Sequence, residues 1–437
     1  MTCEMLELGV LGAQLPSYFE KWNELAKSLP SLLREKKVRE AVHQLPLLDH
    51  SLLQGHQQLR LAHLQLIMIT AYYIWQDGDS GVPKVLPKNV AIPLYKISEE
   101  LGIKPILGHV DLALANWALI DESRPIDFGN LKCLYEIPGG FGGQWFFIVT
   151  FMVEFTFAGC LKPIVRVADM LHSVKDKGSG DQAEISDISR KITACLEDIC
   201  ETTCSLKKVL TRMHDHLSAK TFFNSLRPFL AGWGGEGNAL PEGLIYEGIS
   251  DTPIQLPGGS AAQSSTLQVI DALLGVEHTE DKKEFLKFMQ EFMIPDHRRF
   301  IQTFEQMPFK LRQFMEQNPH PKLLDVYNRC ISALVNLRKY HIQIVTKYVV
   351  IASKETNEGN YESLDSKGTG GTSLIPFLKA VNMDTQSKFV NSNAESNAKS
   401  KTLSFLNTIF HSRATACVLV GLAISFTASA VFKRLKL

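Results

Sequence analysis

The sequence predicts an all-α protein, and three observations lead to this fold class. Apolar residues recur at three- and four-residue steps through nearly the whole chain, which is the period of a helix with one buried face. Residues 334–352 contain neither Gly nor Pro, so nothing inside this stretch breaks a helix. Residues 59–75 are too apolar for a surface helix, and we expect them to be buried between other helices.

The helical segments divide into a small and a large domain. Helices in residues 1–100 form the predicted N-terminal domain, whose first helix has Phe19, Trp22, Leu25 and Leu29 on one face. A stretch with three prolines, Pro83, Pro87 and Pro93, has little predicted regular structure and connects to the large domain, residues 101–383. In the large domain we expect residues 106–120 to be helical and a long buried helix to begin near Trp145.

The C-terminal part has a different composition. Residues 384–413 form a polar predicted linker, and residues 414–432 carry no charge, which is close to the minimum length for a transmembrane helix. A buried C-terminal helix is the alternative, but the polar linker and the basic residues on both sides favour a membrane anchor. We therefore expect the helical domains to be cytoplasmic and tail-anchored to an intracellular membrane, with the mitochondrial outer membrane as one compatible site.

The composition indicates which kinds of ligand and which cellular compartment to expect. Formal net charge is zero and no basic stripe stands out, which argues against nucleic-acid binding. Eight cysteines are spread irregularly, which is typical of free thiols in a reducing cytosol. Cys195, Cys200 and Cys204 precede two histidines, but their spacing differs from a paired Cys-x-x-Cys zinc site. Cys195 fits better on a buried helix face with Ile192 and Ile199.

His341 is the candidate metal ligand. It lies in the middle of an apolar helix face that is formed by Leu334, Leu337, Tyr340, Ile344, Val345 and Tyr348. A histidine in this setting is usually a core residue with one hydrogen bond. A neutral imidazole in an apolar wall is also what haem iron needs as its proximal ligand, and the helix pattern alone leaves both interpretations open.

Residues 338–348, Arg-Lys-Tyr-His-Ile-Gln-Ile-Val-Thr-Lys-Tyr, resemble the proximal-histidine helix of indoleamine 2,3-dioxygenases. Further blocks occur in the same order and at similar spacing as in that family, at residues 114–117, 222–227, 257–265, 293–298 and 368–372. The resemblance covers residues 15–383. It implies an all-α fold with haem b as the cofactor.

The resemblance implies roles for residues on the haem side. His341 would bind the iron and leave the opposite position open for O2. Arg338 could pair with Asp271 or reach a haem propionate, and an ordinary ion pair between helices is compatible with both. Gly259 and its neighbour Gly258 would let the backbone approach the haem edge, and Ser260 could donate a hydrogen bond to a propionate.

On the substrate side, the resemblance implies an aromatic box for an indole ring, formed by Phe146, Phe147 and Phe222, although Phe147 fits a plain core role better. Arg227 would hold the carboxylate of an amino acid, because an unpaired charge in an apolar helix is costly. Thr372 would close over the substrate at the end of a glycine-rich loop. The remaining residues implied to line the substrate site are Thr150 and Ala261.

Several positions depart from the vertebrate members of the family. Thr150 stands where they have Ser, His109 where they have Tyr, and Leu112 and Ala113 where they have Cys and Val. His109 is expected to line the distal wall, where it either only contributes surface, or hydrogen-bonds O2, or in the extreme ligates iron. These changes affect the expected substrate affinity more than the expected reaction.

The implied reaction is the oxidative opening of the indole ring of L-tryptophan and related indoleamines by O2. The product is N-formylkynurenine, in the first step of the kynurenine pathway toward NAD, and a reductant must keep the haem ferrous. The haem carries this chemistry, so no catalytic side chain is assigned. One alternative is a haem protein that binds O2 without efficient tryptophan turnover. Another is a signalling scaffold that uses Tyr246, within a loose tyrosine-based inhibitory motif.

Overall fold

The computed structural model describes residues 13–177, 181–235, 237–356 and 374–390. Met1–Lys388 make one compact unit, and all the structure discussed below lies in it. Phe389–Leu437 make a second unit, which includes the predicted membrane segment 414–432. That segment, most of the predicted linker and the glycine-rich loop with Thr372 lie outside the described residues.

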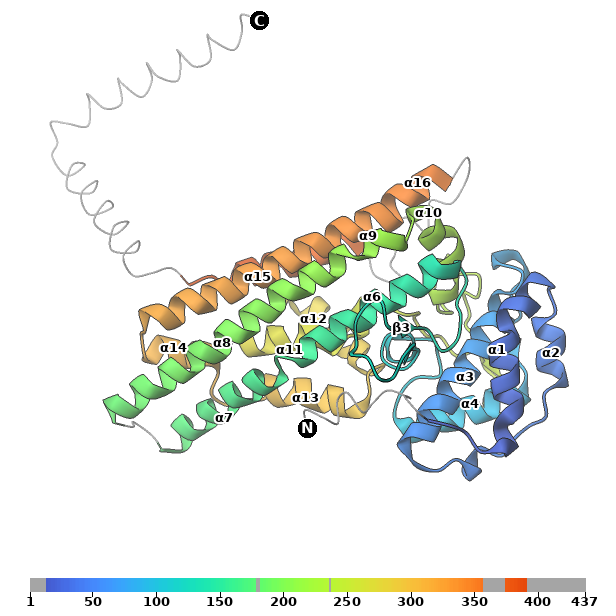
Figure 1. Ribbon diagram of the computed structural model, residues 1–437, viewed down its shortest axis with the longest axis horizontal. Coiled ribbons are helices and arrows are strands. Elements are labelled where there is room, and N and C mark those ends of the chain that lie inside the picture. Colours follow the sequence, from blue (N-terminus) through green and yellow to red (C-terminus); the bar gives the residue numbers. More distant parts are fainter. Residues whose placement is uncertain (1–12, 178–180, 236, 357–373, 391–437) are drawn as a thin grey trace, which may run out of the picture. The chain divides into compact units, whose positions relative to one another are not determined.

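Four helices make up the N-terminal region, drawn in blue in Figure 1. They are α1 (Glu20–Arg34), α2 (Val38–Gln44), α3 (Gly55–Trp75) and α4 (Lys88–Leu101). Every residue of α3 from Leu59 to Trp75 is buried, which confirms the prediction that this run lies between other helices. The predicted apolar face of the first helix is also confirmed, because all four of its residues are buried.

The prediction of little regular structure around the three prolines is wrong from Lys88 onward, where α4 begins. Pro87 is the residue before α4, and Pro93 lies inside that helix. The buried face of α4, which includes Val90, Leu94 and Ile97, packs with α3, so burial outweighs the hydrogen bond that Pro93 cannot make. Gly102 ends the helix in the left-handed conformation.

Residues 106–120 are not one helix, in contrast to the prediction. They form the short α5 (His109–Leu112) and the strand β2 (Ala118–Leu119). The Asn116 side chain holds the intervening backbone, since its amide donates to the Tyr135 carbonyl at 2.9 Å and its oxygen accepts from the Tyr135 amide at 2.8 Å. This long-range pairing replaces the local helical hydrogen bonds that the apolar pattern predicts.

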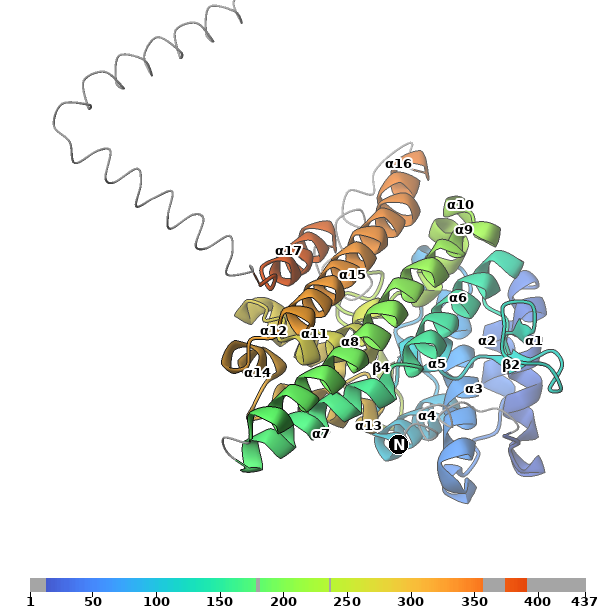
Figure 2. The same ribbon diagram turned by 60° about the vertical axis from the view of Figure 1, so that its left-hand side comes forward.

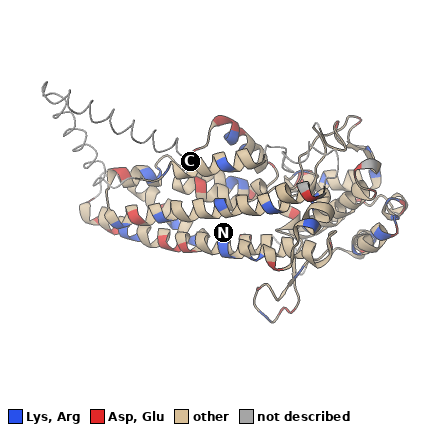
Figure 3. Cartoon of the chain, turned by 90° about the horizontal axis from the view of Figure 1, so that it is seen from above, with Lys and Arg blue, Asp and Glu red and all other residues tan. Residues whose placement is uncertain are grey.

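Three long helical rows make up the large region. They are α6 (Gly140–Ala158) with α7 (Leu161–Lys177), α8 (Gln182–Thr211), and α15 (Pro321–Val345). In Figures 1 and 2, α8 lies between the other two rows. Figure 3 shows acidic and basic residues interspersed along these helices. Ile192, Cys195 and Ile199 are buried on one face of α8, as predicted.

Shorter elements complete the unit. The remaining α-helices are α9 (Met213–His216), α10 (Ala219–Thr221), α11 (Ser265–Leu274), α12 (Glu280–Gln290), α13 (Pro295–Glu305), α14 (Leu311–Gln317), α16 (Ala352–Thr356) and α17 (Leu374–Gln386). The π-helical turns are η4 (Phe222–Leu226) and η7 (Thr346–Ile351), and the 3₁₀ turns are η1 (Ser17–Phe19), η2 (His50–Leu52), η3 (Asp79–Gly81), η5 (Arg227–Leu230) and η6 (Ala261–Gln263). Strands β1 (Val85–Leu86) and β4 (Ile245–Tyr246) pair in parallel, and β2 pairs antiparallel with β3 (Leu131–Lys132). The described fold is therefore predominantly helical.

Two features bear on the predicted domain boundaries. The hydrophobic core of α1–α4 continues past residue 100 to Leu112, Phe147 and Trp233, so the division there stays a prediction. Helix α17 continues to Gln386, past the predicted boundary at 383. Among the described residues, one helical stretch, Gly140–Val174, is long and apolar enough to cross a membrane, and it forms α6 and most of α7 against α8.

Candidate functional site

A cavity lies between α15 and α6, and short segments from α5, α8 and residues 259–267 close its sides. It encloses about 1080 Å³ of space without protein atoms, part of it open to solvent. Most of the lining side chains are apolar, and the polar ones are His109, Thr150, Glu154, Ser260, Ser264, Thr266, Arg338 and His341.

His341 is the cavity residue whose chemistry best suits a metal. It lies near the end of α15, and its ring nitrogens have no hydrogen-bond partner among the described residues. Burial, with a smaller effect of the Arg338 charge, lowers the pKa of His341 to about 4. The imidazole is therefore neutral near pH 7, with a lone pair available to a ligand in the cavity. The residues on this wall fit a haem whose iron binds His341.

Arg338 lies one helical turn before His341 and also lines the cavity. Its guanidinium donates to the Asp271 carboxylate of α11, which confirms the predicted pairing, and to the Thr385 hydroxyl of α17. Burial alone would raise the pKa of Asp271, but Arg338 and His278 hold it below its ordinary value. The carboxylate stays charged, so the pair fixes the helix that carries His341 to two other helices.

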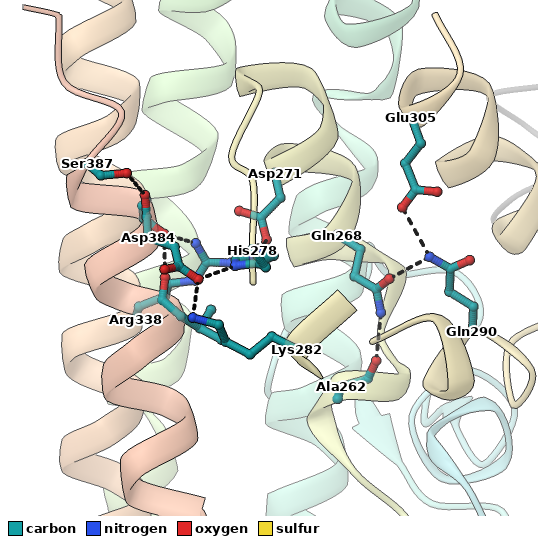
Figure 4. A network of polar contacts seen from close by, with 12 residues as sticks. Ala262, Gln268, Asp271, His278, Lys282, Gln290, Glu305, Arg338, Asp384 and Ser387 are labelled. Carbon is teal, nitrogen blue, oxygen red and sulfur yellow. Dashed lines mark hydrogen bonds and ion pairs between the residues drawn. The ribbon is translucent and has the colours of Figure 1, made fainter. Parts of the chain in front are cut away.

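This ion pair belongs to a larger buried network, which Figure 4 shows. His278 lies between two carboxylates, with Nε2 3.3 Å from Asp271 and Nδ1 2.8 Å from Asp384. The Lys282 ammonium lies 2.6 Å from the same Asp384 carboxylate. Side chains from α11, α12, α15 and α17 thus meet directly behind the haem-side wall.

The wall opposite His341 is aromatic. Phe146, Phe147 and Thr150 of α6 line the cavity, as the resemblance implies for the first and last of them. Phe147 is also part of the hydrophobic core. Phe222 is not among the cavity-lining residues, but its ring centroid lies 5.2 Å from that of Phe146 and supports it. The Thr150 hydroxyl donates to the Phe147 carbonyl at 2.9 Å, so its oxygen can still accept from a ligand.

The backbone at residues 258–261 forms a third wall. Gly259, Ser260 and Ala261 line the cavity. At Gly258 a Cβ atom would lie 2.0 Å from the Leu230 carbonyl oxygen, so this position accepts only glycine because two backbone segments meet there. A Cβ atom at Gly259 would make ordinary contacts at 3.5 Å or more. Contacts within the protein therefore require glycine at Gly258 but not at Gly259.

Arg227 is buried, as expected, and begins η5 immediately after the π turn η4. The helix changes its hydrogen-bond pattern there because Pro228 cannot continue it. The guanidinium carbon lies 5.3 Å from the centroid of the Phe223 ring. Arg227 is not among the residues that line the cavity, so its contact with a substrate carboxylate stays a prediction. Thr372 lies outside the described residues, and its role also stays a prediction.

Sequence reasoning missed Glu154 and the two hydroxyl residues bound to it. Glu154 is the one charged residue of α6, eight residues after Phe146 on the cavity-facing side. It binds His109 as well as Ser264 and Thr266. The cost of burying a charged side chain drew attention to Arg227. The same argument, applied to the Glu154 carboxylate, would have identified Glu154.

Tyr246 is fully buried in β4, and its hydroxyl donates to the Pro105 carbonyl at 2.7 Å. Burial raises its pKa well above the ordinary value. A modifying enzyme cannot reach this hydroxyl unless β4 leaves its site, so the native fold opposes the signalling hypothesis.

Comparisons with known proteins agree with this geometry. A model of the family described as "Indoleamine 2,3-dioxygenase" matches residues 11–388, a range that ends where the compact unit ends. A protein named myoglobin from Haliotis diversicolor is 42% identical over 372 residues, which are 85% of this chain and 92% of that protein. Indoleamine 2,3-dioxygenase 1 of Rattus norvegicus is 38% identical over 384 residues, with 85% and 90% covered. Indoleamine 2,3-dioxygenase of Saccharomyces cerevisiae is 32% identical over 409 residues, with 84% and 87% covered. The chain therefore belongs to the indoleamine 2,3-dioxygenase family, whose members bind haem.

Proposed function

We propose that this protein is a haem-dependent dioxygenase that opens the indole ring of L-tryptophan with O2 and releases N-formylkynurenine. The observation that carries the proposal is the pairing of His341 with an aromatic wall across one cavity. An imidazole without a hydrogen-bond partner suits the iron, and the Phe146 side suits a flat apolar ring. Family membership supports the same reaction class.

Each wall has a separate task in this proposal. When bound, the haem iron supplies the activation of O2. His341 holds the cofactor, while Arg338 and Asp271 keep the helix of His341 in place. Phe146 and Phe147 orient the indole and exclude water from it. Arg227 holds the carboxylate of the amino acid, an interaction worth about 1.5–3 kcal/mol for each charged hydrogen bond.

A second candidate function is O2 binding without efficient tryptophan turnover. Two relatives from Haliotis species that are 42% and 41% identical to this chain are named myoglobin. Such a protein needs the His341 side of the cavity but no group for an amino-acid carboxylate. The two functions differ in the need for a carboxylate-binding group, so turnover of L-tryptophan and its dependence on Arg227 distinguish them.

One experiment separates the two functions. The purified haem protein is mixed with L-tryptophan, ascorbate and methylene blue in air, and the absorbance of N-formylkynurenine is followed. A dioxygenase accumulates product until tryptophan is consumed. An O2 carrier forms no product, although the reduced protein binds and releases O2 reversibly in the same buffer.

The Arg227→Ala variant sharpens this test. We expect it to retain haem, because Arg227 does not line the cavity wall formed by His341. Loss of one or two charged hydrogen bonds lowers kcat/KM for L-tryptophan by roughly ten- to a hundredfold or more. The matched control is Arg190→Ala, which removes an exposed arginine of α8. Normal turnover in Arg227→Ala would exclude the carboxylate role.

A further inference from the structure

Glu154 and His109 form a polar pair in the wall of the cavity. The His109 Nε2 atom lies 3.0 Å from the Glu154 Oε1 atom, and both side chains are almost buried, with 12% and 10% of their surface exposed. Both residues line the cavity. The pair joins α5 to α6, so the two helices fix its position from both sides.

The hydrogen bonds of Glu154 are almost saturated. Its Oε1 atom accepts from the Ser264 hydroxyl as well as from His109, and its Oε2 atom accepts from the Thr266 hydroxyl at 2.9 Å. Burial alone would raise the pKa of Glu154, but these donors together hold it below the ordinary value. An ionised carboxylate only accepts hydrogen bonds, so the His109 Nε2 atom must carry a proton.

This arrangement determines what His109 offers to a ligand. With Nε2 donating to Glu154, Nδ1 is the ring nitrogen that remains for a ligand, as an acceptor in the neutral imidazole and as a donor in the imidazolium. No hydrogen-bond partner for Nδ1 is found among the described residues. Leu112 and Ala113, the cavity residues that follow His109, are apolar and cannot supply one. The cavity wall therefore presents one ring nitrogen that has no hydrogen-bond partner among the described residues.

The position of the pair along α6 indicates which part of a substrate reaches it. Phe146, Thr150 and Glu154 follow each other at four-residue steps, so each lies about 6 Å further along the same helix face. If an indole ring packs on Phe146 with its carbocyclic edge toward Thr150, that edge points along the helix face toward Glu154 and His109. That edge of L-tryptophan carries only C–H groups, which leave Nδ1 unpaired when water is displaced.

From this geometry we infer that His109, held by Glu154, selects indoles with a hydroxyl group on the carbocyclic ring over unsubstituted L-tryptophan. The hydroxyl, which can both donate and accept, forms a hydrogen bond with Nδ1, and Glu154 acts as the positioning residue that holds the ring through Nε2. The inference rests on the proposed function, because it deepens the substrate choice of the same site.

The test is a set of binding titrations with the ferric haem protein. The change in haem absorbance gives Kd for L-tryptophan and for 5-hydroxy-, 6-hydroxy- and 7-hydroxy-L-tryptophan. We expect at least one hydroxylated compound to bind about three- to tenfold more tightly than L-tryptophan, the gain from one neutral hydrogen bond. His109→Phe should abolish this preference, because phenylalanine offers no ring nitrogen to the hydroxyl.

His172→Phe is the matched control, since it makes the same substitution at an exposed histidine of α7 and should keep the preference. The inference is overturned if no hydroxylated compound binds more tightly to the native protein, or if the preference persists in His109→Phe. The first result needs no variant, so poor folding of His109→Phe cannot rescue the inference. If neither L-tryptophan nor any analogue perturbs the haem absorbance, the proposed function fails as well, and the two failures are thus distinguishable.

Discussion

The guanidinium of Arg338 and the carboxylate of Asp271 join the helix that carries His341 to helix α11. Both side chains are buried, with 6% and 9% of their surface exposed. Removal of Arg338 leaves the buried Asp271 carboxylate with His278 as its ion-pair partner, and removal of Asp271 leaves a buried guanidinium, so either change destabilises the fold. The pair therefore controls both the stability of the fold and the position of the proposed iron ligand.

We predict that Arg338→Met lowers the free energy of unfolding by up to about 3–5 kcal/mol, and by less than that limit to the extent that His278 compensates Asp271. Chemical denaturation of the haem protein measures this change. The double variant Arg338→Met with Asp271→Leu should recover most of the loss, because neither charge then remains buried. A double variant that is no more stable than Arg338→Met would show that the pair does not account for the effect.

The stability of the α17 contact should depend on pH through His278. Burial lowers the pKa of His278, but Asp271 and Asp384 raise it more, so the net shift is upward despite the nearby Arg338 and Lys282 charges. A raised histidine pKa adds stability that is complete below the unfolded value of 6.5 and is lost as pH rises through the folded value. We therefore expect the native protein to have a higher free energy of unfolding than His278→Gln, and this difference should be larger at about pH 6 than at about pH 9. Equal differences at both pH values would contradict this assignment.

The end of α17 should be required for the stability of the compact unit. Asp384 and Thr385 contribute to the buried network, and both lie beyond the predicted domain end at residue 383. We expect a chain that ends at Met383 to unfold at a lower denaturant concentration than one that ends at Lys388. The second chain keeps the whole of α17 and should match the stability of the full-length protein. Identical midpoints for the two shortened chains would exclude a role for the last turn of α17.

The uncharged segment at residues 414–432 remains a predicted membrane anchor. Its length and basic flanks support this, and a chain that ends at Lys388 lacks it. We expect the full-length protein to sediment with membranes after cell lysis and to resist extraction with high salt. The shortened chain should remain in the supernatant. A full-length protein found in the supernatant would rule out the anchor.

Local patterns predict most of the helices because burial acts on residues that are close in sequence. The composition of α3 shows that it is a buried apolar run, and the three- and four-residue spacing of apolar residues shows the buried face of α1. The prediction fails at residues 106–120, where Asn116 bonds to Tyr135 across nineteen residues, and at Pro93, where packing on α3 outweighs a local rule. Neither of these tertiary contacts can be recognised from the residues that are close in sequence.

For the candidate site too, local sequence patterns predict some features, whereas contacts between distant residues could not be predicted. The pattern around His341 indicates either a core histidine or a ligand, and only the resemblance favoured the ligand. The pairing of Arg338 with Asp271 was predicted and is confirmed. The contact of His278 with Asp384 joins residues 106 positions apart, so no spacing rule could indicate it. Glu154 was detectable as the one charge in an apolar helix, but its partners His109, Ser264 and Thr266 are brought to it by the fold.

The most direct measurement is the absorbance spectrum of the purified protein after reconstitution with hemin and removal of free hemin. The native protein should retain a Soret band, and the exposed-residue control His172→Ala should retain it equally. His341→Ala should lose the band, because no other side chain is assigned to hold the iron. An unchanged Soret band in His341→Ala, or a colourless native protein, would contradict the assignment of His341 as the haem ligand.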